Sequence, residues 1–443
     1  MSRRVISGWG LYPAIEACVE QARFPADLPA LVRRGRRLLP QGNCRSYGDA
    51  CLYPRVASML GLRHLLAFDA EQGRLRAEAG ITLDRILRFT VPRGWFLPVT
   101  PGTKFPTLGG CLAADVHGKN HHVDGTLGRY VEELEMVLAD GSWVRCSANQ
   151  HAGLFEATLG GMGLTGFIYA ATVRLRRIES SWIRVRSLRV SSFAELCRLF
   201  AQTSAQTTYS VAWIDCLARG GGMGRGILML GEHLGARGAG RAHPLRPHGE
   251  GGIDVPCHLP GGLLNSWSMR AFNALYYHRQ VRAQVTRVMH YDPFFYPLDT
   301  VGHWNRIYGR DGFLQYQFVV PFQDGEEVLQ EVLGRIAARG AASFLAVLKT
   351  LGPERGLLSF PMPGYTLALD IPLRDGGVIP FLRDLNRTVI RAGGRSYLAK
   401  DAILQGEEVE AMYPRLPEFR QVRHRYDPAG LFRSALSDRL GLS

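Results

Sequence analysis

Residues 98–129 constrain the fold of this chain more than any other stretch, because they read PVTPGTKFPTLGGCLAADVHGKNHHVDGTLGR. Glycine stands at positions 102, 109, 110, 118, 125 and 128, mostly small side chains occupy residues 111–114, and histidines stand at positions 117, 121 and 122. Glycine lacks a Cβ and accepts positive φ, so a glycine-rich backbone can come within contact distance of a ligand. This composition predicts a loop that holds a large ligand.

Two further segments are rich in glycine and adjoin predicted strands. Residues 41–49 (QGNCRSYGD) follow the apolar pair Leu38 and Leu39, and residues 159–166 (LGGMGLTG) precede the alternating run 167–175. Apolar alternation of this kind indicates a strand. Three glycine-rich loops, each beside a strand, predict one long ligand held along its length by main-chain N–H groups.

Length and composition indicate a globular protein of two or three domains. The 443 residues are 46% hydrophobic and 21% charged, which is ordinary for a globular chain. No apolar run reaches the roughly 18 residues that would span a bilayer, and residues 1–10 lack the apolar core of a signal peptide. We therefore expect a location in the cytoplasm or at the periphery of the inner membrane. The eight cysteines show no CxxC and no metal-ligand spacing, which predicts reduced thiols.

The net charge of +14, from 53 Lys and Arg against 39 Asp and Glu, favours anionic partners. Most of the excess is dispersed arginine, with one tight cluster at positions 33, 34, 36 and 37. We interpret this charge as a solvated basic surface, with a membrane-facing patch as the alternative. A nucleic-acid-binding module is disfavoured because no recognisable binding motif accompanies the charge.

Short strands and glycine turns alternate with brief helices between residues 36 and 175, a pattern typical of the α+β class. Residues 83–90 are expected to form a helix, and Asp140-Gly141 predicts a hairpin. Further strands are expected at 209–215, 313–321, 343–348 and 365–371, and further helices at 326–339 and 379–392. The second half of the chain therefore predicts a sheet covered by helices.

Two segments between these elements have other patterns. Residues 219–252 are rich in Gly, Arg, Pro and His with little apolar periodicity. We interpret part of them as a mobile loop over a binding cleft, with a flexible linker as the alternative. Aromatic residues stand at positions 267, 272, 276 and 277, near helical spacing, and we expect this stripe to lie in the core.

Two motifs are set aside on their context. Residues 161–166 formally match GxGxxG, but a dinucleotide fingerprint follows a strand and opens a helix. Here a helix-like segment precedes the motif and a strand follows it, which excludes that interpretation. His117 and His121 have the i, i+4 spacing of metal ligands, but Gly118 disfavours a helix and no carboxylate partner is nearby, so we predict no metal site.

A family resemblance rests on several of these motifs. The pattern PGTxxxxxGGxxAxxxHG at residues 101–118 resembles the PCMH-type FAD-binding fold of the vanillyl-alcohol oxidase group. More narrowly, the chain resembles the decaprenylphosphoryl-β-D-ribose 2′-oxidases, from Gly8 through Phe432. The motifs that carry this narrower resemblance are HGKNHH at 117–122, RSYGD at 45–49, FLQYQF at 313–318 and AKD at 399–401.

The resemblance implies an α+β fold of two domains, with a substrate domain inserted into a PCMH-type FAD-binding domain. Residues 1–180 would form the FAD-binding domain and residues 181–394 the substrate domain, an antiparallel sheet covered by helices. Residues 395–443 would return to the FAD-binding domain. By the same resemblance, the periplasmic face of the inner membrane is a further possible location.

The resemblance also implies the positions that contact FAD. The first loop has no histidine for covalent attachment, so we expect noncovalent FAD, with a thioether to Cys44 as the alternative. The expected contacts are Gln41, Gly42, Asn43, Cys44, Arg45, Ser46, Tyr47, Gly48, Asp49, Ala50, Gly102, Thr107, Leu108, Gly109, Gly110, Ala114, Asp115, Val116, His117, Ile168 and Tyr397.

The catalytic residues carried over from the family are Lys400 and His117. Lys400 would hydrogen-bond the sugar hydroxyl and stabilise the developing alkoxide, and His117 would lie against the flavin ring. Gln315 and Gln317 alternate along one strand, so both amides are expected on one face. The expected substrate-binding residues are Trp213, Gln315, Gln317, Lys349, Ala368 and Lys400, with Lys349 facing the substrate phosphate.

Two departures from the family pattern bear on the substrate. Ala368 stands where the family has a reactive cysteine, and residues 294–299 read FFYPLD where the family has FYHPLD. Catalysis should survive the first change, because no step assigned above uses a thiol.

The function implied is oxidation of the 2′-hydroxyl of a polyprenyl-phosphate-linked ribose to the 2′-keto sugar. That reaction is the first half of an epimerisation to the arabinose donor of cell-envelope polysaccharide, and a short-chain dehydrogenase/reductase would complete it. The lipid tail of such a substrate implies peripheral membrane contact. The alternative is an FAD-linked oxidase or dehydrogenase of another sugar, an alditol or a sugar lactone.

Overall fold

Two sheets form most of the first part of the chain in the computed structural model, which describes residues 2–239, 243–249, 252–260, 262–341 and 344–442. The first sheet has the order β1-β2-β4-β3, with β4 parallel to both of its neighbours. The second sheet has the order β5-β6-β10-β8-β9 and is antiparallel throughout. Their strands are β1 (Ser2–Ser7), β2 (Ala14–Gln21), β3 (Leu39–Gln41), β4 (Arg55–Ser58), β5 (Leu65–Asp69), β6 (Arg74–Glu78), β8 (Val131–Val137), β9 (Trp143–Cys146) and β10 (Phe167–Arg174).

Short helices cover these sheets and position the glycine-rich loops. The predicted helix at 83–90 is confirmed as α2 (Leu83–Thr90), whose apolar face is buried, and the predicted hairpin is confirmed between β8 and β9, with Gly141 at φ 83°. The other helices here are α1 (Asp27–Arg33), α3 (Leu108–Ala113), α4 (His121–Asp124) and α5 (Ala152–Thr158).

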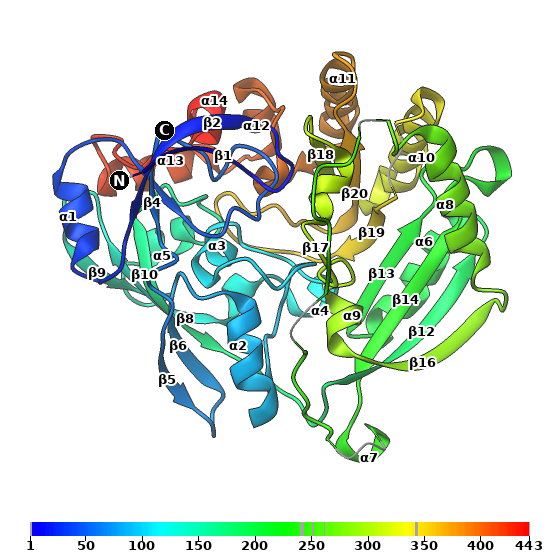
Figure 1. Ribbon diagram of the computed structural model, residues 1–443, viewed down its shortest axis with the longest axis horizontal. Coiled ribbons are helices and arrows are strands. Elements are labelled where there is room, and N and C mark those ends of the chain that lie inside the picture. The colour runs from blue at the N-terminus through cyan, green and yellow to red at the C-terminus, as the bar shows by residue number, and fades with distance from the viewer. Residues whose placement is uncertain (1, 240–242, 250–251, 261, 342–343, 443) are drawn as a thin grey trace.

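One large antiparallel sheet dominates the second part (Figure 1). Its order is β16-β12-β14-β13-β19-β20-β18-β21. Eight of the nine residues of β18 are buried, as expected of a strand covered on both faces. The strands are β12 (Trp182–Val190), β13 (Tyr209–Ile214), β14 (Gly226–His233), β16 (Gln284–His290), β18 (Phe313–Pro321), β19 (Ala346–Leu351), β20 (Gly364–Pro372) and β21 (Arg395–Ser396).

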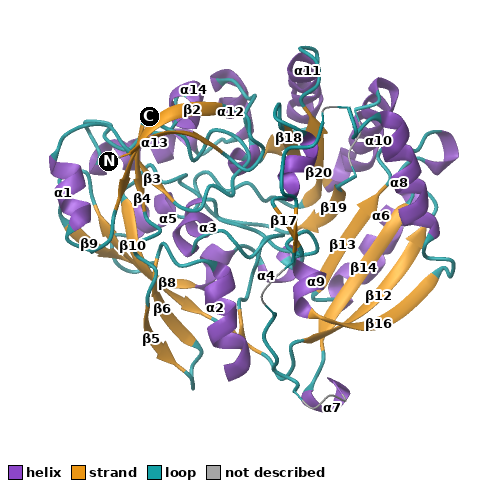
Figure 2. Ribbon diagram, viewed as in Figure 1, coloured by secondary structure: helices purple, strands orange, loops and turns teal. Residues whose placement is uncertain are grey.

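Helices cover the two faces of this sheet unequally. Ala212 and Ile214 of β13 point into the core formed with α6 (Phe193–Thr203), α10 (Phe322–Arg339) and α11 (Val378–Arg391). Trp213 points to the opposite face, where it packs against Tyr277 of α8 (Ser266–His278). The sheet is therefore covered by α6, α10 and α11 on one face and in part by α8 on the other (Figure 2).

The C-terminal helices pack back against the first part of the chain. They are α12 (Gly406–Met412), α13 (Leu416–Tyr426) and α14 (Ala435–Leu440). Helix α13 contacts α5, and the ring of Phe432 lies 5.4 Å from that of Phe167 on β10. Both termini consequently lie on the same side of the molecule (Figure 1). The mixture of helices with largely antiparallel sheets confirms the α+β prediction.

Three expectations need correction. Residues 226–233, expected to lie in a loop or linker, form β14 in the interior of the large sheet, where the short run GILMLGEH pairs with β12 and β13. In the segment 219–252 that was expected to be a loop or linker, residues 240–242 and 250–251 lie outside the described residues. The strand expected at 343–348 is β19, which begins at Ala346, and residue 343 is also outside the described part. The aromatic stripe is not all core, because Trp267 is 78% exposed.

Candidate functional site

A cavity of about 450 Å³ runs between the glycine-rich loops and the large sheet. This volume lies within the range of roughly 300–1,000 Å³ typical of ligand pockets. Its walls combine residues 40–51 and 101–117 with Met162 and Gly163 of the third loop and with side chains of β18, β19 and β20. The three glycine-rich loops predicted to share one ligand thus meet around one cavity.

Glycine at position 42 allows the first two loops to approach each other. A Cβ on Gly42 would lie 2.4 Å from the Oγ1 of Thr107, which accepts a hydrogen bond from the N–H of Gly110. The Asn43 side-chain amide donates to the carbonyl of Phe105 at 2.9 Å and joins the same two loops. A side chain at position 42 would therefore push the loops apart.

Open space and unpaired polar atoms mark this end of the cavity as a ligand site. A Cβ on Gly102 would meet no described atom within 4 Å. The Nε of Arg45 and the Oγ of Ser46 are buried without a hydrogen-bond partner among the described residues. The Arg45 guanidinium lies 4.0 Å from the ring centroid of Trp9, which holds it at the cavity wall. Buried polar atoms of this kind are usually satisfied, so a polar ligand is the natural partner.

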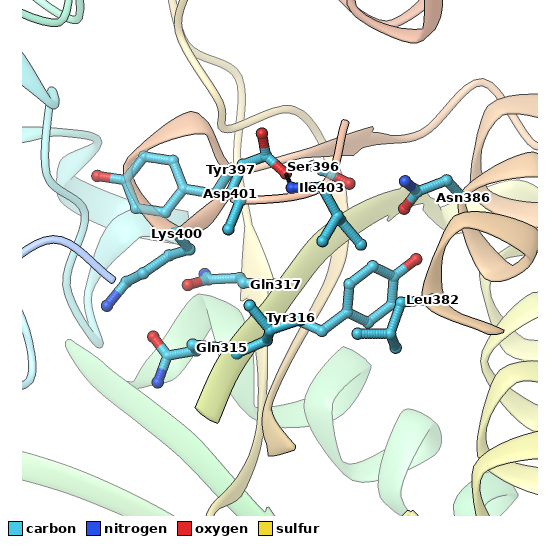
Figure 3. Close-up of a pocket in the computed structure, with 12 residues that line it drawn as sticks. Gln315, Tyr316, Gln317, Leu382, Asn386, Ser396, Tyr397, Lys400, Asp401 and Ile403 are labelled. Atoms are coloured by element: carbon cyan, nitrogen blue, oxygen red, sulfur yellow. Dashed lines mark hydrogen bonds between the residues drawn. The ribbon is translucent and has the colours of Figure 1, made fainter. Parts of the chain in front are cut away.

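The other end of the cavity is lined by amide and ammonium groups. Figure 3 shows Gln315 and Gln317 on one side of β18 and Tyr316 on the other, so the predicted alternation is confirmed. Lys400 is the last residue of the short 3-10 helix 398–400 and points to the same side as the two amides (Figure 3). Its Nζ lies 3.9 Å from the ring centroid of Tyr47, which belongs to the first glycine-rich loop.

His117 links the glycine-rich loop to β18. The Gln317 amide donates to the Nε2 of His117 at 3.0 Å, and the imidazole packs against the stacked rings of Phe360 and Tyr397. Burial, followed by the charge of Lys349, holds the pKa of His117 well below its ordinary value. The ring is therefore neutral with its proton on Nδ1, which has no partner among the described residues and is free to donate.

Two partly buried lysines of the lining, Lys400 and Lys349, give this end of the cavity a positive charge, and Lys119 lies outside the lining. Burial lowers the pKa of Lys400 to about 7, with Asp370 opposing the shift and Lys349 adding to it. Burial also lowers the pKa of Lys349 to about 8 and that of Lys119, which Lys349 perturbs further, to about 7. The repulsion between these ammonium groups favours the binding of an anionic ligand.

Asp370 stands beside this cationic group. Burial raises the pKa of the carboxyl, and the hydrogen bond from Gln315, at 2.6 Å, and the charge of Lys400 oppose the rise. The pair Gln315 and Asp370 faces across β18 and β20. Asp370 thus orients one of the two cavity amides.

Most residues predicted from the sequence line the cavity. Among the predicted substrate residues, only Trp213 does not, because it lies one strand farther along the sheet beneath α8, with its indole N–H donating to the carbonyl of Phe344. The predicted residues found in the lining are Gln41, Gly42, Asn43, Cys44, Arg45, Ser46, Tyr47, Ala50, Gly102, Thr107, Gly109, Gly110, Ala114, Val116, His117, Ile168, Gln315, Gln317, Lys349, Ala368, Tyr397 and Lys400.

Four of the predicted cofactor contacts lie behind the lining instead. Gly48 packs against the carbonyl of Asp401, and Asp49 pairs with Arg439. Leu108 is part of the apolar core, and the Asp115 carboxylate accepts from the N–H of Gly128 and from Ser359. The geometry therefore gives these positions a supporting role in the loops, since Gly48 packs against backbone and the other three side chains contact protein partners.

Sequence reasoning missed several groups at the cavity. Trp9, Phe105, Asp299 and Trp304 line it, and burial raises the pKa of Asp299 to about 6. Lys119 lies inside the HGKNHH motif but is not part of the lining, and its Nζ donates to the carbonyl of Phe294. Phe105 belongs to the glycine-rich stretch itself, whereas Trp9, Asp299 and Trp304 reach the cavity from distant parts of the chain.

Neither a metal cluster nor a membrane-spanning helix is found in the described part of the chain. No group of three or more His, Cys, Asp or Glu residues there could hold a metal ion. Among the same residues, no helix combines the length and apolar character needed to cross a bilayer.

Comparison with known proteins identifies the class and then the family. The FAD binding domain family matches residues 18–147, at the glycine-rich loops that line the cavity, so the chain is an FAD-dependent oxidoreductase. The D-arabinono-1,4-lactone oxidase family matches residues 312–440. The chain is 34% identical to the decaprenylphosphoryl-beta-D-ribose oxidase of Mycolicibacterium smegmatis over 99% of its own length and 97% of that protein. It belongs to the decaprenylphosphoryl-β-D-ribose oxidase family.

Two other relatives show how far the similarity extends. An uncharacterized protein of Streptomyces coelicolor is 34% identical over 82% of this chain and 100% of that protein. The human Delta(24)-sterol reductase is 29% identical over 33% of this chain and 28% of that protein. The likeness to the sterol reductase is therefore limited to one part of the chain.

The residues at the cavity fit FAD. The glycine backbone at Gly42 and Gly102 leaves room for a ligand in close contact. The unpaired atoms of Arg45 and Ser46 can meet the polar groups of a dinucleotide, and the Nδ1–H of His117 can meet an acceptor on the ring system.

Proposed function

We propose that this protein oxidises the 2′-hydroxyl of a polyprenyl-phosphate-linked ribose to the 2′-keto sugar. This reaction would be the first half of an epimerisation that yields an arabinose donor for cell-envelope polysaccharide. A short-chain dehydrogenase/reductase would act second, because the keto sugar must be reduced to complete the inversion. The near full-length similarity to a decaprenylphosphoryl-beta-D-ribose oxidase supports this assignment.

The observation that carries the proposal is the convergence of Lys400, Gln317 and His117 where β18 meets the glycine-rich loops. FAD, when bound, supplies the acceptor for the two electrons removed from the alcohol carbon. Lys400, with its pKa lowered to about 7, is partly neutral at physiological pH. A neutral amine can take the hydroxyl proton, and the resulting ammonium stabilises the developing charge on oxygen.

Lys349 is proposed to bind the phosphate of the substrate. It lies on β19 next to Val347, which pairs with Ala368 of β20, and all three line the cavity. A phosphate would restore the charged form of a lysine whose pKa burial has lowered to about 8. Ala368 would leave a wall without a nucleophile at the position where the family has a cysteine.

We further propose that residues 1–180 together with 395–443 form the FAD-binding domain and that residues 181–394 form the substrate domain. FAD would be held noncovalently by the cavity residues of the three glycine-rich loops, although Cys44 lines the same cavity and keeps the thioether alternative testable. Acid precipitation should leave the yellow flavin in the supernatant. A yellow pellet, turned colourless by Cys44→Ala, would contradict noncovalent binding.

The alternative substrate class is a free sugar, an alditol or a sugar lactone. The match of residues 312–440 to the D-arabinono-1,4-lactone oxidase family is the observation in its favour. That match covers the C-terminal part alone, whereas the similarity to the lipid-linked ribose oxidase extends over 99% of the chain. We therefore favour the lipid-linked substrate.

Substrate profiling tests this choice. Turnover with a dye acceptor would be compared for a polyprenyl-phosphate ribose, D-arabinono-1,4-lactone and an alditol, and the product mass would be measured. We expect the highest kcat/KM for the phosphate-linked ribose and a product lighter by two hydrogens. A higher kcat/KM for the lactone or the alditol would overturn the assignment.

Because the proposed substrate carries a lipid tail, we also propose peripheral contact with the inner membrane.

A further inference from the structure

An unpartnered apolar face lies on α8 and the segment that follows it. Trp267 is 78% exposed, Leu275 is 74% exposed and Val281 is 78% exposed. Trp267 and Leu275 are eight residues apart on one helix and therefore share a face. Large apolar side chains exposed together mark an interaction surface more often than a plain solvated one.

The charged side chains of this segment are of one sign. Residues 262–290 contain four arginines, at positions 270, 279, 282 and 287, and no Asp or Glu. All four arginines are exposed. None of them forms an ion pair with an acidic group in the described part of the chain. An apolar stripe flanked by unpaired arginines matches the composition of a helix that lies in the interface of an anionic bilayer.

The same helix adjoins the wall of the cavity. The ring of Phe272 on α8 lies 6.0 Å from that of Phe344, which lies 6.5 Å from the ring of Trp304 in the cavity lining. Leu264, just before α8, packs in the cluster that contains Trp304 and Tyr47. In Figure 1, α8 lies on the opposite side of the molecule from β9 and α1.

We propose that α8 and residues 279–282 form the surface by which this protein docks on an anionic lipid bilayer. Trp267, Leu275 and Val281 would enter the headgroup region, and the flanking arginines would contact lipid phosphates. Docking by this surface places the aromatic wall of the cavity next to the bilayer. A lipid-linked sugar would then pass from the membrane into the cavity. This passage rests on the proposed function, whereas the docking of the protein on the bilayer does not depend on it.

Vesicle flotation of the intact, flavin-loaded protein tests the docking surface. Vesicles of phosphatidylcholine with about a third phosphatidylglycerol would be compared with pure phosphatidylcholine, using wild type and two double variants. For the double variant Arg270→Gln with Arg282→Gln, we expect the partition coefficient onto the anionic vesicles to fall roughly 25-fold, which is about fivefold for each arginine. For Trp267→Ala with Leu275→Ala we expect a loss of at least about tenfold.

A matched control uses the arginine cluster on the other side of the molecule. Arg36 and Arg37 are exposed and follow α1. The variant Arg36→Gln with Arg37→Gln removes the same charge and should float like wild type. If this variant loses binding while the α8 variants keep it, the docking surface is the arginine cluster and the proposal is wrong.

The remaining outcomes separate docking from catalysis. We expect both α8 variants to keep wild-type turnover of a short-chain, water-soluble phosphate-ribose analogue and to lose turnover of long-chain substrate in vesicles. Loss of turnover with the soluble analogue would make α8 part of the substrate site instead. Failure of wild type to float, with self-association that Trp267→Ala abolishes, would make the face an interface between copies. Either result overturns the docking proposal and leaves the proposed reaction to its own substrate test.

Discussion

Arg439 of α14 ties the first glycine-rich loop to the segment that carries Lys400, and its removal should loosen both. Its guanidinium donates to the Asp49 carboxylate at 2.8 and 2.9 Å and to the Asp401 carboxylate at 2.8 Å. Asp49 and Asp401 are almost fully buried, with side-chain exposures of 7% and 3%, whereas that of Arg439 is 23%. Arg439→Met would therefore leave two buried carboxylates without their shared cation.

Breaking a buried ion pair from one side costs about 3–5 kcal/mol of the free energy of unfolding. We expect about 3 kcal/mol, the lower end of that range, because Arg439 is 23% exposed and water can reach the vacated space. Asp401 retains hydrogen bonds from the N–H groups of Ile403 and Leu404, which also limits the loss.

Urea unfolding followed by tryptophan fluorescence would measure this loss, and the fluorescence of released flavin would report the loosened loop. Arg433→Met is the matched control, because Arg433 is 22% exposed but its partner Asp438 is 42% exposed. Exposed pairs contribute about 1 kcal/mol or less, so the control should unfold close to wild type. Equal unfolding midpoints for Arg439→Met and Arg433→Met would refute the reasoning.

Four further predictions concern the cavity. Gly42→Ala should weaken FAD binding and lower the free energy of unfolding by about 1–3 kcal/mol, since its Cβ would lie 2.4 Å from Thr107, as measured by flavin release and urea unfolding. Gly102→Val should weaken FAD binding with an unchanged apoprotein midpoint, because its side chain would enter open space. Lys400→Met should slow flavin reduction by about 10²–10⁴-fold in single-turnover kinetics, while Lys349→Met should mainly raise KM. The reduction rate should increase as pH rises through about 7, because Lys400 then loses its proton and can accept one, and this dependence should be absent in Lys400→Met.

Local features of the site could be predicted from the sequence because their chemistry is local. Glycine-rich loops were predicted to approach a ligand closely because glycine lacks a Cβ, and Gly42 and Gly102 of these loops line the cavity. The placement of Gln315 and Gln317 on one face follows from the two-residue period of a strand. The place of His117 was predicted from the family resemblance, and its side chain lines the cavity.

The remaining features depend on contacts between distant segments. Trp304 packs in one cluster with Tyr47 of the first loop, and Asp299 accepts a hydrogen bond from the N–H of Lys104 in the second loop. Both contacts join segments far apart in the chain, which no local pattern encodes. The strand β14 was missed because its apolar run is short and flanked by glycine and arginine, and pairing on both sides stabilises it. Trp213 lies outside the lining because β13 is one strand farther along the sheet than β19, and the order of the strands is itself a tertiary feature.

The most direct test of the central claim is the visible spectrum of the flavin under anaerobic conditions, recorded before and after addition of a polyprenyl-phosphate ribose. The account predicts that the absorbance near ~450 nm bleaches with wild type and bleaches at least about a hundredfold more slowly with Lys400→Met. A yellow protein that stays oxidised with this substrate but bleaches with a free sugar, an alditol or a lactone would contradict the account.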